Sequence, residues 1–305
     1  MTIKHCLLPA PDSIPPLILA STDALVAKTA FLAGMVAPET AACLSRLLMA
    51  SDAGYSRIID GHHTVPEVLK DSRNFESQQS TRGSITELRR RIVAALDHHH
   101  RLLQVQPPPD GDGVVARRIV RLHFAQLGLH PQLWSLARGL ARRHEEYHAA
   151  FAMTDRTRER EFDHGIQLSG KTSLTFIEFM LDVCHEEVDY MTAAMTRHKL
   201  REAVLHALRT NSRLQKTGVR PEAAPAFLAL LIQGALPRAE FEVFTGLQPE
   251  EAHDQVARLI NIGLVVSPSS NACTLEVGIP VWFAENILPD LHQRLIRSHI
   301  HNRSL

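Results

Sequence analysis

The sequence predicts a mainly α-helical protein, in which a larger helical part precedes a smaller part of short helices and a β-hairpin. Two observations predict this class. Apolar residues recur every three or four positions up to about residue 209, and the alternation typical of strands is nearly absent there. Further on, three short helical patterns end at glycines and lead into two short strand-like segments around a Ser/Asn turn.

The composition is that of an ordinary globular protein. The chain has 305 residues, of which 45% are hydrophobic and 22% charged, so we expect about two domains and a sizeable core. The net charge of zero excludes an overall attraction to nucleic acid or anionic membranes. The four cysteines are widely spaced and indicate neither a zinc site nor a disulfide framework. Residues 1–21 do not resemble a signal peptide, because their apolar patch is short and interrupted by prolines, and there is no apolar run of 18 residues for a membrane span. We therefore expect a soluble, cytoplasmic protein without a membrane span.

The first two helices are expected on either side of a glycine-containing loop. "SITELRRRIVAALDHHHRLL" (84–103) opens with Ser84 and Glu87 at the spacing of a capping box, and its apolar positions are Ile85, Leu88, Ile92 and Leu96. After the loop, a second helix ends near Gly128 and places on one face Ala116, Val120, Phe124 and Leu127.

Two further helices complete the first part. The third is expected over Trp134–Ala152 and the fourth over 173–191, with a charged connector (155–171) between them. In the fourth helix the positions expected to face inward are Leu174, Ile177, Leu181, Val188 and Met191.

The composition shifts after Thr196. Residues 197–220 hold seven Lys and Arg against one Glu, which predicts a basic connecting helix and linker. In 221–305 one helix ends at Gly234, a second has Pro237 at its start and Gly246 at its end, and a third runs from Pro249 to Gly263. With the hairpin in 264–280, these elements predict a winged helix-turn-helix domain over 221–305, after a helical domain over 1–196.

The loop in "LQVQPPPDGDGVVAR" (103–117) has two interpretations. Gly111 and Gly113 allow an anion-binding backbone nest at a helix N-terminus, Asp110 could hold Mg²⁺, and Arg117 could reach a phosphate. The same residues also suit a plain connector between helices. Asp112 would repel a phosphate unless a cation intervened, so the residues alone leave both interpretations open.

A longer match surrounds this loop. From His99, "HHRLLQVQPPPDGDGVVAR" resembles the signature HPFx[D/E]GNGRxxR of the Fic family. The segments 133–159 and 168–191 resemble those that follow the motif in Fic proteins with a C-terminal winged helix. "YSRIIDGHHTVPEVL" (55–69) resembles the family's inhibitory segment. The resemblance implies a Fic-type helical domain that transfers AMP from MgATP to a hydroxyl of a target protein.

The resemblance also implies roles for single residues. Asp110 takes the metal position, and the phosphate positions are Gly111, Asp112, Gly113 and Arg117. The inhibitory segment keeps Ser56, Asp60 and Gly61, and in the family its acid pairs with the second motif Arg, here Arg117. Asp60 is one methylene shorter than the family's Glu. The Asp60–Arg117 pair is therefore interpreted either as a retained brake on nucleotide binding or as an ion pair that fixes helix packing.

Several departures predict impaired catalysis. Gln106 stands where the family has its general-base His. General-base catalysis typically raises the reaction rate by a factor of about 10²–10⁴. The motif's Phe is Pro108, its nest Asn is Asp112 and its first Arg is Val114. The segment between Asp60 and Gln106 shows no strand pair that could form the family's target-docking flap. We expect a protein with little or no transferase activity.

The remaining features favour structural roles. His98, His99 and His100 point in three directions on a helix, so they cannot chelate one ion, and we expect Trp134, Tyr147 and Phe151 in the core. The third helix of the second domain carries Glu250, Glu251 and Asp254 against Arg258 alone, which opposes binding to DNA phosphates. The alternative to an impaired enzyme is a regulator whose helical scaffold dimerises or binds a partner, with the winged helix acting on protein or DNA.

Overall fold

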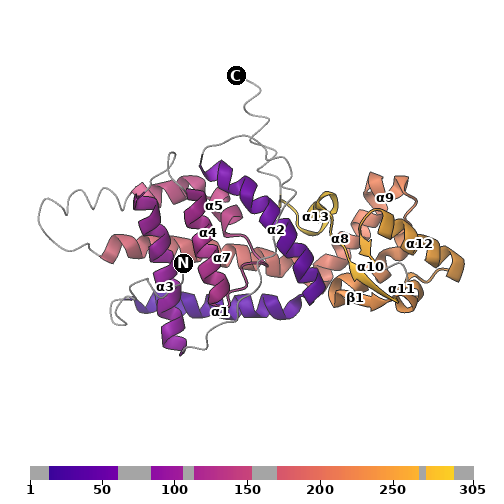
Figure 1. The fold of residues 1–305 in the computed structure, drawn as a ribbon, viewed down its shortest axis with the longest axis horizontal. Coiled ribbons are helices and arrows are strands. Elements are labelled where there is room, and N and C mark those ends of the chain that lie inside the picture. The colour runs from indigo at the N-terminus through magenta and orange to yellow at the C-terminus, as the bar shows by residue number, and fades with distance from the viewer. Residues whose placement is uncertain (1–13, 61–83, 106–112, 153–169, 268–272, 292–305) are drawn as a thin grey trace, which may run out of the picture. The chain divides into compact units, whose positions relative to one another are not determined.

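The computed structural model describes residues 14–60, 84–105, 113–152, 170–267 and 273–291. The described chain is mainly helical with a few short strands, which confirms the predicted class (Figure 1). It divides into two compact units. Unit 1 takes its described residues from Met1–Phe31 and Ala50–Asp189, and unit 2 from Leu32–Met49 and Tyr190–Gln293.

Unit 1 is built from helices packed around an apolar core. Its helices are α1 (Pro16–Met35), α2 (Pro38–Ile59), α3 (Ile85–Val105), α4 (Gly113–Gln126), α5 (Leu136–Arg142), a helical stretch at 144–152 and α7 (Gly170–Ala194). The C-terminal ends of α1 and α7 and the first half of α2 belong to unit 2. Large, fully buried side chains fill the core of unit 1: Leu25, Tyr55, Phe124, Trp134, Tyr147 and Phe176.

The sequence pattern does not predict helix α1, because prolines near its start interrupt the apolar spacing. Pro16 is its first residue, a position where the missing backbone N–H costs no helical hydrogen bond. Its buried stripe recurs every three or four residues: Ile18, Thr22, Leu25, Thr29 and Leu32. By length and composition alone this helix could cross a membrane, which corrects the expectation that no such segment exists. Asp23 on α1 accepts hydrogen bonds from Arg89 of α3 at 2.6 and 2.5 Å.

Helices α3 and α4 lie against each other (Figure 1). The Glu87 N–H donates to Ser84 Oγ at 3.4 Å, as the capping pattern predicts. Of the face predicted for α3, Ile92 and Leu96 are buried, Leu88 is half-buried, and Ile85, the first residue of the helix, is 68% exposed. In α4 the whole predicted face is buried: Ala116, Val120, Phe124 and Leu127. Gly128 follows with a φ of 75°, which suits a helix end.

The single helix predicted over Trp134–Ala152 is wrong. Trp134 precedes α5 and donates its Nε1–H to the Leu129 carbonyl at 2.8 Å. Ser135 caps α5 by accepting a hydrogen bond from the Arg138 N–H. Arg143 then leaves the helical region, with φ −115° and ψ 35°, and the chain becomes helical again at 144. Periodicity alone could not show this break, because the apolar spacing continues across it.

Helix α5 crosses α7 so closely that only glycine fits at position 139. A Cβ there would lie 2.5 Å from Val183 Cγ1 and 2.8 Å from Glu187 Cγ. We expect Gly139→Ala to lower the free energy of unfolding by about 1–3 kcal/mol through overpacking. Gly34→Ala in α1 is the matched control, because a Cβ there meets nothing within 4 Å and alanine favours helix. Urea unfolding of both variants tests this; equal stability of the two would contradict the close approach.

Unit 2 contains further helices and one small sheet. Its elements are α8 (Arg197–Thr210), α9 (Ser212–Lys216), η3 (Pro221–Ala223), α10 (Ala224–Gln233), β1 (Ala235–Pro237), α11 (Arg238–Thr245), α12 (Pro249–Asn261), β2 (Val265–Val266), β3 (Thr274–Val277) and α13 (Val281–Ile287). The antiparallel sheet has the order β1-β3-β2, with Leu236 opposite Leu275 and Val265 opposite Val277.

The glycine stops predicted for the short helices are confirmed. Gly234 and Gly246 cap α10 and α11 with φ values of 81° and 67°, and Gly263 follows α12 with 78°. The hairpin expected in 264–280 is formed by β2 and β3. Strand β1 was not predicted, because it is three residues long and ends in Pro237. The expected connector at 197–220 contains α8, whose Leu200, Val204, Ala207 and Leu208 are buried within unit 2.

Candidate functional site

The candidate site lies where the C-terminal end of α2 meets the first turns of α4. Arg117 of α4 is buried, with 3% of its side chain exposed. Its Nη2 donates to Asp60 Oδ2 at 2.6 Å and to the Ser56 carbonyl at 3.0 Å. Its Nε donates to Ser56 Oγ at 3.2 Å. Two of the inhibitory-segment residues predicted from the sequence therefore hold Arg117 on one side.

The other side of the same pair has no hydrogen-bond partner. Arg117 Nη1 and Asp60 Oδ1 are both buried, and neither makes a hydrogen bond to a described residue. Both atoms face Gly113, the first residue of α4. A Cβ at that position would lie 2.7 Å from Asp60 Oδ1 and 3.0 Å from Arg117 Nη1. A buried charged group with unused donors and acceptors is costly, so this arrangement is typical of a site that a polar ligand can complete.

The helix terminus adds positive potential at this point. The first N–H groups of α4 have no partner within the helix, and the helix dipole favours an anion beside them. Asp60 supplies such an anion in the present structure. A phosphate group would compete for the same Arg117 side chain and the same end of α4. The geometry therefore allows either Asp60 or an external anion to neutralise Arg117.

A layer of aromatic and imidazole side chains packs behind Arg117. Tyr147 is buried, and its hydroxyl lies 3.0 Å from His99 Nε2. Burial raises the pKa of Tyr147, while the nearby Arg117 guanidinium opposes that rise. His148 Nε2 lies 3.0 Å from the carbonyl of Ile59, the last residue of α2. These contacts fix the end of α2, and with it the position of Asp60.

The structure brings together four of the site residues predicted from the sequence. Ser56, Asp60, Gly113 and Arg117 meet at the α4 N-terminus. The remaining predicted positions lie outside the described residues: Gln106, Asp110, Gly111, Asp112 and Gly61, together with Pro108 and most of the segment in which a flap is not expected (61–83). Among the described residues no group of three or more His, Cys, Asp or Glu side chains could hold a metal ion.

Tyr147 and His148 were not predicted as neighbours of the site. Tyr147 was expected only as a core residue, which its 1% exposure confirms. A signal was present in the sequence, because "HEEYH" (144–148) lies in the segment whose resemblance to the Fic pattern is described above. The spacing alone did not show which element this helix would contact.

The three consecutive histidines take three different environments, as predicted. His98 stacks on His123 of α4 with ring centroids 5.3 Å apart, His99 contacts Tyr147, and His100 packs against Phe176 at 4.8 Å. Burial lowers the pKa of His99 to about 3 and that of His123 to about 4. Both imidazoles are therefore neutral at pH 7 and belong to the packed interior between α3 and α4.

These lowered pKa values predict a loss of stability in mild acid. The unfolded chain takes up protons on these residues as the pH falls below about 6.5, while the folded chain does not. The contribution of these two histidines to the free energy of unfolding is complete above that pH and falls as the pH approaches 4. Between pH 7.5 and 5, the free energy of unfolding of His123→Phe should therefore fall by about 2 kcal/mol less than that of the parent. Urea unfolding at both pH values tests this; parallel losses in the parent and the variant would contradict it.

A second buried charge cluster joins α5 to α7. Arg138 Nη1 donates to both carboxylate oxygens of Glu187 at 2.8 Å, and 3% and 1% of the two side chains are exposed. Burial raises the pKa of Glu187, and Arg138 opposes this rise. Nearby, Asp52 of α2 accepts hydrogen bonds from Arg121 and Ser135. This cluster holds the helices of unit 1 together, and we assign it a structural role.

Comparison with models of known protein families gives no match to this chain, and comparison with curated proteins gives none. The residues at the α4 N-terminus are therefore the basis on which we infer a function.

Proposed function

We propose that this chain is a Fic-like protein whose unit 1 binds the phosphates of a nucleotide at the N-terminus of α4. Asp60 acts as a brake that occupies Arg117, and AMP transfer is slow or absent. The observation that carries this proposal is the buried Asp60–Arg117 pair, whose Oδ1 and Nη1 atoms have no hydrogen-bond partner among the described residues and face Gly113. A purely structural ion pair has no need of unused polar atoms beside a helix N-terminus.

Nucleotide binding follows from what happens when Asp60 withdraws. Arg117 then lacks its carboxylate, and a phosphate oxygen can accept hydrogen bonds from Nη1 and Nη2 while the α4 dipole stabilises its charge. The resemblance assigns the adjoining backbone to Gly111 and Asp112 and the Mg²⁺ position to Asp110. MgATP would supply the AMP group for transfer to a protein hydroxyl, and pyrophosphate would leave as the bond between the α- and β-phosphates breaks.

Loss of the base explains why transfer is slow. The proton of an attacking hydroxyl needs an acceptor, and the amide of Gln106 has no useful basicity near neutral pH. Residues of the scaffold can still bind and orient the phosphates without it. We therefore expect nucleotide binding, which Arg117 and Gly113 support, without efficient AMP transfer, because Gln106 cannot act as the base.

An AMP-transfer assay with ATP labelled at the α-phosphate tests the proposal. We expect no labelling by the parent and measurable self-labelling by Gln106→His/Asp60→Ala, which restores the base and releases Arg117. Adding Arg117→Met to that double variant should abolish the labelling. Transfer by the parent at the rate of the double variant would overturn the pseudoenzyme assignment. Absence of both labelling and nucleotide binding in every variant would overturn the Fic-like assignment.

We further propose that unit 2 contains a winged helix-turn-helix domain. The order α10, α11, α12 followed by the β2–β3 hairpin supports this, as does the tight turn at Gly246 between α11 and α12. Such a domain suits a cytoplasmic regulator whose scaffold pairs with a second copy or with a target protein. Surface charge then decides what the domain binds.

A further inference from the structure

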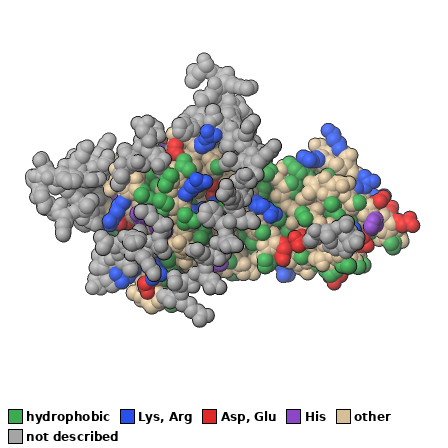
Figure 2. Space-filling model, viewed as in Figure 1, with side chains coloured by type: hydrophobic (Ala, Val, Ile, Leu, Met, Phe, Trp, Pro, Cys, Tyr) green, Lys and Arg blue, Asp and Glu red, His purple; other side chains and the backbone are tan. Residues whose placement is uncertain are grey.

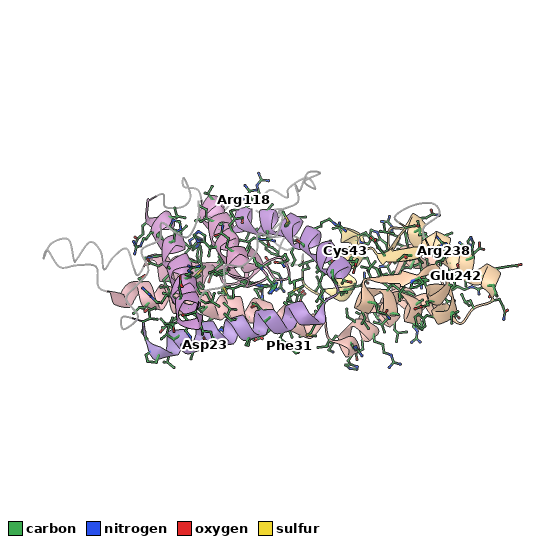
Figure 3. All side chains as sticks on the ribbon, turned by 60° about the horizontal axis from the view of Figure 1, so that its bottom comes forward. Asp23, Phe31, Cys43, Arg118, Arg238 and Glu242 are labelled. Carbon is green, nitrogen blue, oxygen red and sulfur yellow. The ribbon has the colours of Figure 1, made fainter. Side chains whose placement is uncertain are left out.

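Helix α1 has an exposed face without polar side chains. Leu17 and Phe31 are 79% and 62% exposed, and Leu17 is the most exposed large hydrophobic side chain among the described residues. Figure 3 marks Phe31 at the outer edge of the helix. A continuous apolar face of this kind is typical of a contact surface. The exposed residues of α1 are all apolar or glycine: Pro16, Leu17, Ala20, Ala24, Ala27, Ala30, Phe31 and Gly34.

Helix α12 shows what an ordinary surface helix of this chain exposes. Its exposed residues include Glu250, Asp254 and Arg258, and charged side chains of both signs show at the end of unit 2 that carries it (Figure 2). Helix α1 has only two charged residues, Asp23 and Lys28. A position at the surface therefore does not by itself explain the composition of the exposed face of α1.

The polar side chains of α1 already have partners within the chain. Lys28 Nζ donates to Asp189 Oδ2 of α7 at 2.6 Å, and Asp23 pairs with Arg89 of α3. The remaining polar side chains also make hydrogen bonds within the chain: Ser21, Thr22 and Thr29. These bonds hold α1 in unit 1, whereas an apolar helix that lies on a membrane usually carries free Lys or Arg. A partner of α1 would meet no unpaired charge on this helix.

The exposed residues follow the spacing of a helix–helix contact. Leu17, Ala20, Ala24, Ala27 and Phe31 are separated alternately by three and four residues. The contact positions of a two-stranded coiled coil have this spacing, because it keeps them on one narrow stripe of the helix. The three alanines are small, so a second helix can approach the stripe closely.

The stripe is complementary in size to a second copy of itself when the two helices run antiparallel. In the register that places Ala24 opposite Ala27 of the second copy, Phe31 of each copy lies opposite Ala20 of the other. A two-fold axis between the helices makes every such contact twice, as an isologous interface requires.

The same register accommodates the other large side chain. Leu17 lies opposite Gly34, which has no side chain and where a Cβ would meet nothing within 4 Å. A parallel arrangement would instead place Phe31 against Phe31 and Leu17 against Leu17, and would leave the alanines between them poorly packed. The distribution of large and small residues therefore favours an antiparallel pair.

We propose that the α1 face, defined by Leu17, Ala20, Ala24, Ala27 and Phe31, is the contact between two copies of this chain. Pairing removes the exposed leucine and phenylalanine of both copies from water. The contact is small beside the roughly 1,200–2,000 Å² that stable interfaces bury, so we expect a dimer that dissociates on dilution. This inference does not depend on the function proposed for unit 1.

Sedimentation equilibrium of the full chain at about 1–300 µM tests the contact. We expect a reversible monomer–dimer equilibrium. Ala24→Glu places a carboxylate at the centre of the contact, away from water, and should weaken the dimer at least tenfold. Ala257→Glu makes the same change at an exposed position of α12 and should leave the dissociation constant within about twofold. Ala27→Glu replaces Ala24→Glu if circular dichroism shows that the first variant does not fold.

Disulfide cross-linking tests the antiparallel register. Ala20→Cys and Phe31→Cys are made as separate variants in a protein that also carries Cys6→Ser and Cys273→Ser, since Cys43 and Cys184 are buried. Oxidation by copper phenanthroline in air should give a covalent dimer when the two variants are mixed. Each variant alone should give none, because identical positions lie about 16 Å apart along the antiparallel helices.

Several results would overturn the proposal. These are a monomer at every concentration, a dimer that Ala24→Glu leaves intact, and equal weakening by Ala257→Glu. Cross-linking of either cysteine variant with itself, without cross-linking of the mixture, would contradict the antiparallel pair. Co-sedimentation of monomers with phosphatidylserine vesicles that is lost in Ala24→Glu would overturn the proposal in favour of a membrane surface.

Discussion

Replacing Arg117 with Met is expected to lower the free energy of unfolding by about 3–5 kcal/mol. The substitution leaves the Asp60 carboxylate buried, with 6% of its side chain exposed, and without its only charged partner among the described residues. It also removes the donors to Ser56 Oγ and to the Ser56 carbonyl. Urea unfolding at pH 7 measures the change.

Arg118→Met is the matched control for this substitution. Arg118 follows Arg117 in the sequence but points away from the helices into solvent (Figure 3). We expect its replacement to change stability by less than about 0.5 kcal/mol. The double variant Asp60→Leu/Arg117→Met removes both charges, so it should lose much less than the sum of the two single variants. Equal losses for Arg117→Met and Arg118→Met would show that the ion pair does not stabilise unit 1.

Replacing Glu187 with Leu is expected to have an effect of similar size, about 3–5 kcal/mol. Glu187 accepts two hydrogen bonds from Arg138 at 2.8 Å in the interior of unit 1. Without it, a buried guanidinium loses its carboxylate where α5 crosses α7. Thermal and urea unfolding measure the loss.

The neighbouring residue provides the control for this prediction. Glu186 has 48% of its side chain exposed and pairs with Arg143 at 3.0 Å. Exposed ion pairs contribute about 0–1 kcal/mol, so Glu186→Leu should cost no more than that. A loss in Glu187→Leu as small as that in Glu186→Leu would contradict the structural role of the Arg138–Glu187 pair.

Local sequence patterns are enough to predict an element when its buried face and its end follow from its own residues. The buried face of α4 and the glycine stops of α10, α11 and α12 are examples, because side-chain spacing and positive φ are local properties. The Asp60–Arg117 contact came from the resemblance to a family motif. Nothing in the spacing of two residues 57 positions apart shows that they meet.

Features that depend on distant contacts could not be predicted. The break at Arg143, where φ is −115° and ψ is 35°, is concealed by an apolar spacing that continues across it. Arg138 and Glu187 meet only because Gly139 lets α5 approach α7 closely. The acidic residues of α12 were visible in the sequence, whereas the exposure of Val243 and Phe244 depends on how α11 packs.

The most direct test of the central claim is calorimetric titration of MgATP into the parent protein, Asp60→Ala and Asp60→Ala/Arg117→Met. If the α4 N-terminus is a phosphate site held closed by Asp60, the first variant binds at least tenfold more tightly than the parent, and the double variant does not bind. Circular dichroism before each titration shows whether the variants are folded. Absence of binding by a folded Asp60→Ala, or equal affinity in all three proteins, would contradict a nucleotide site at Arg117.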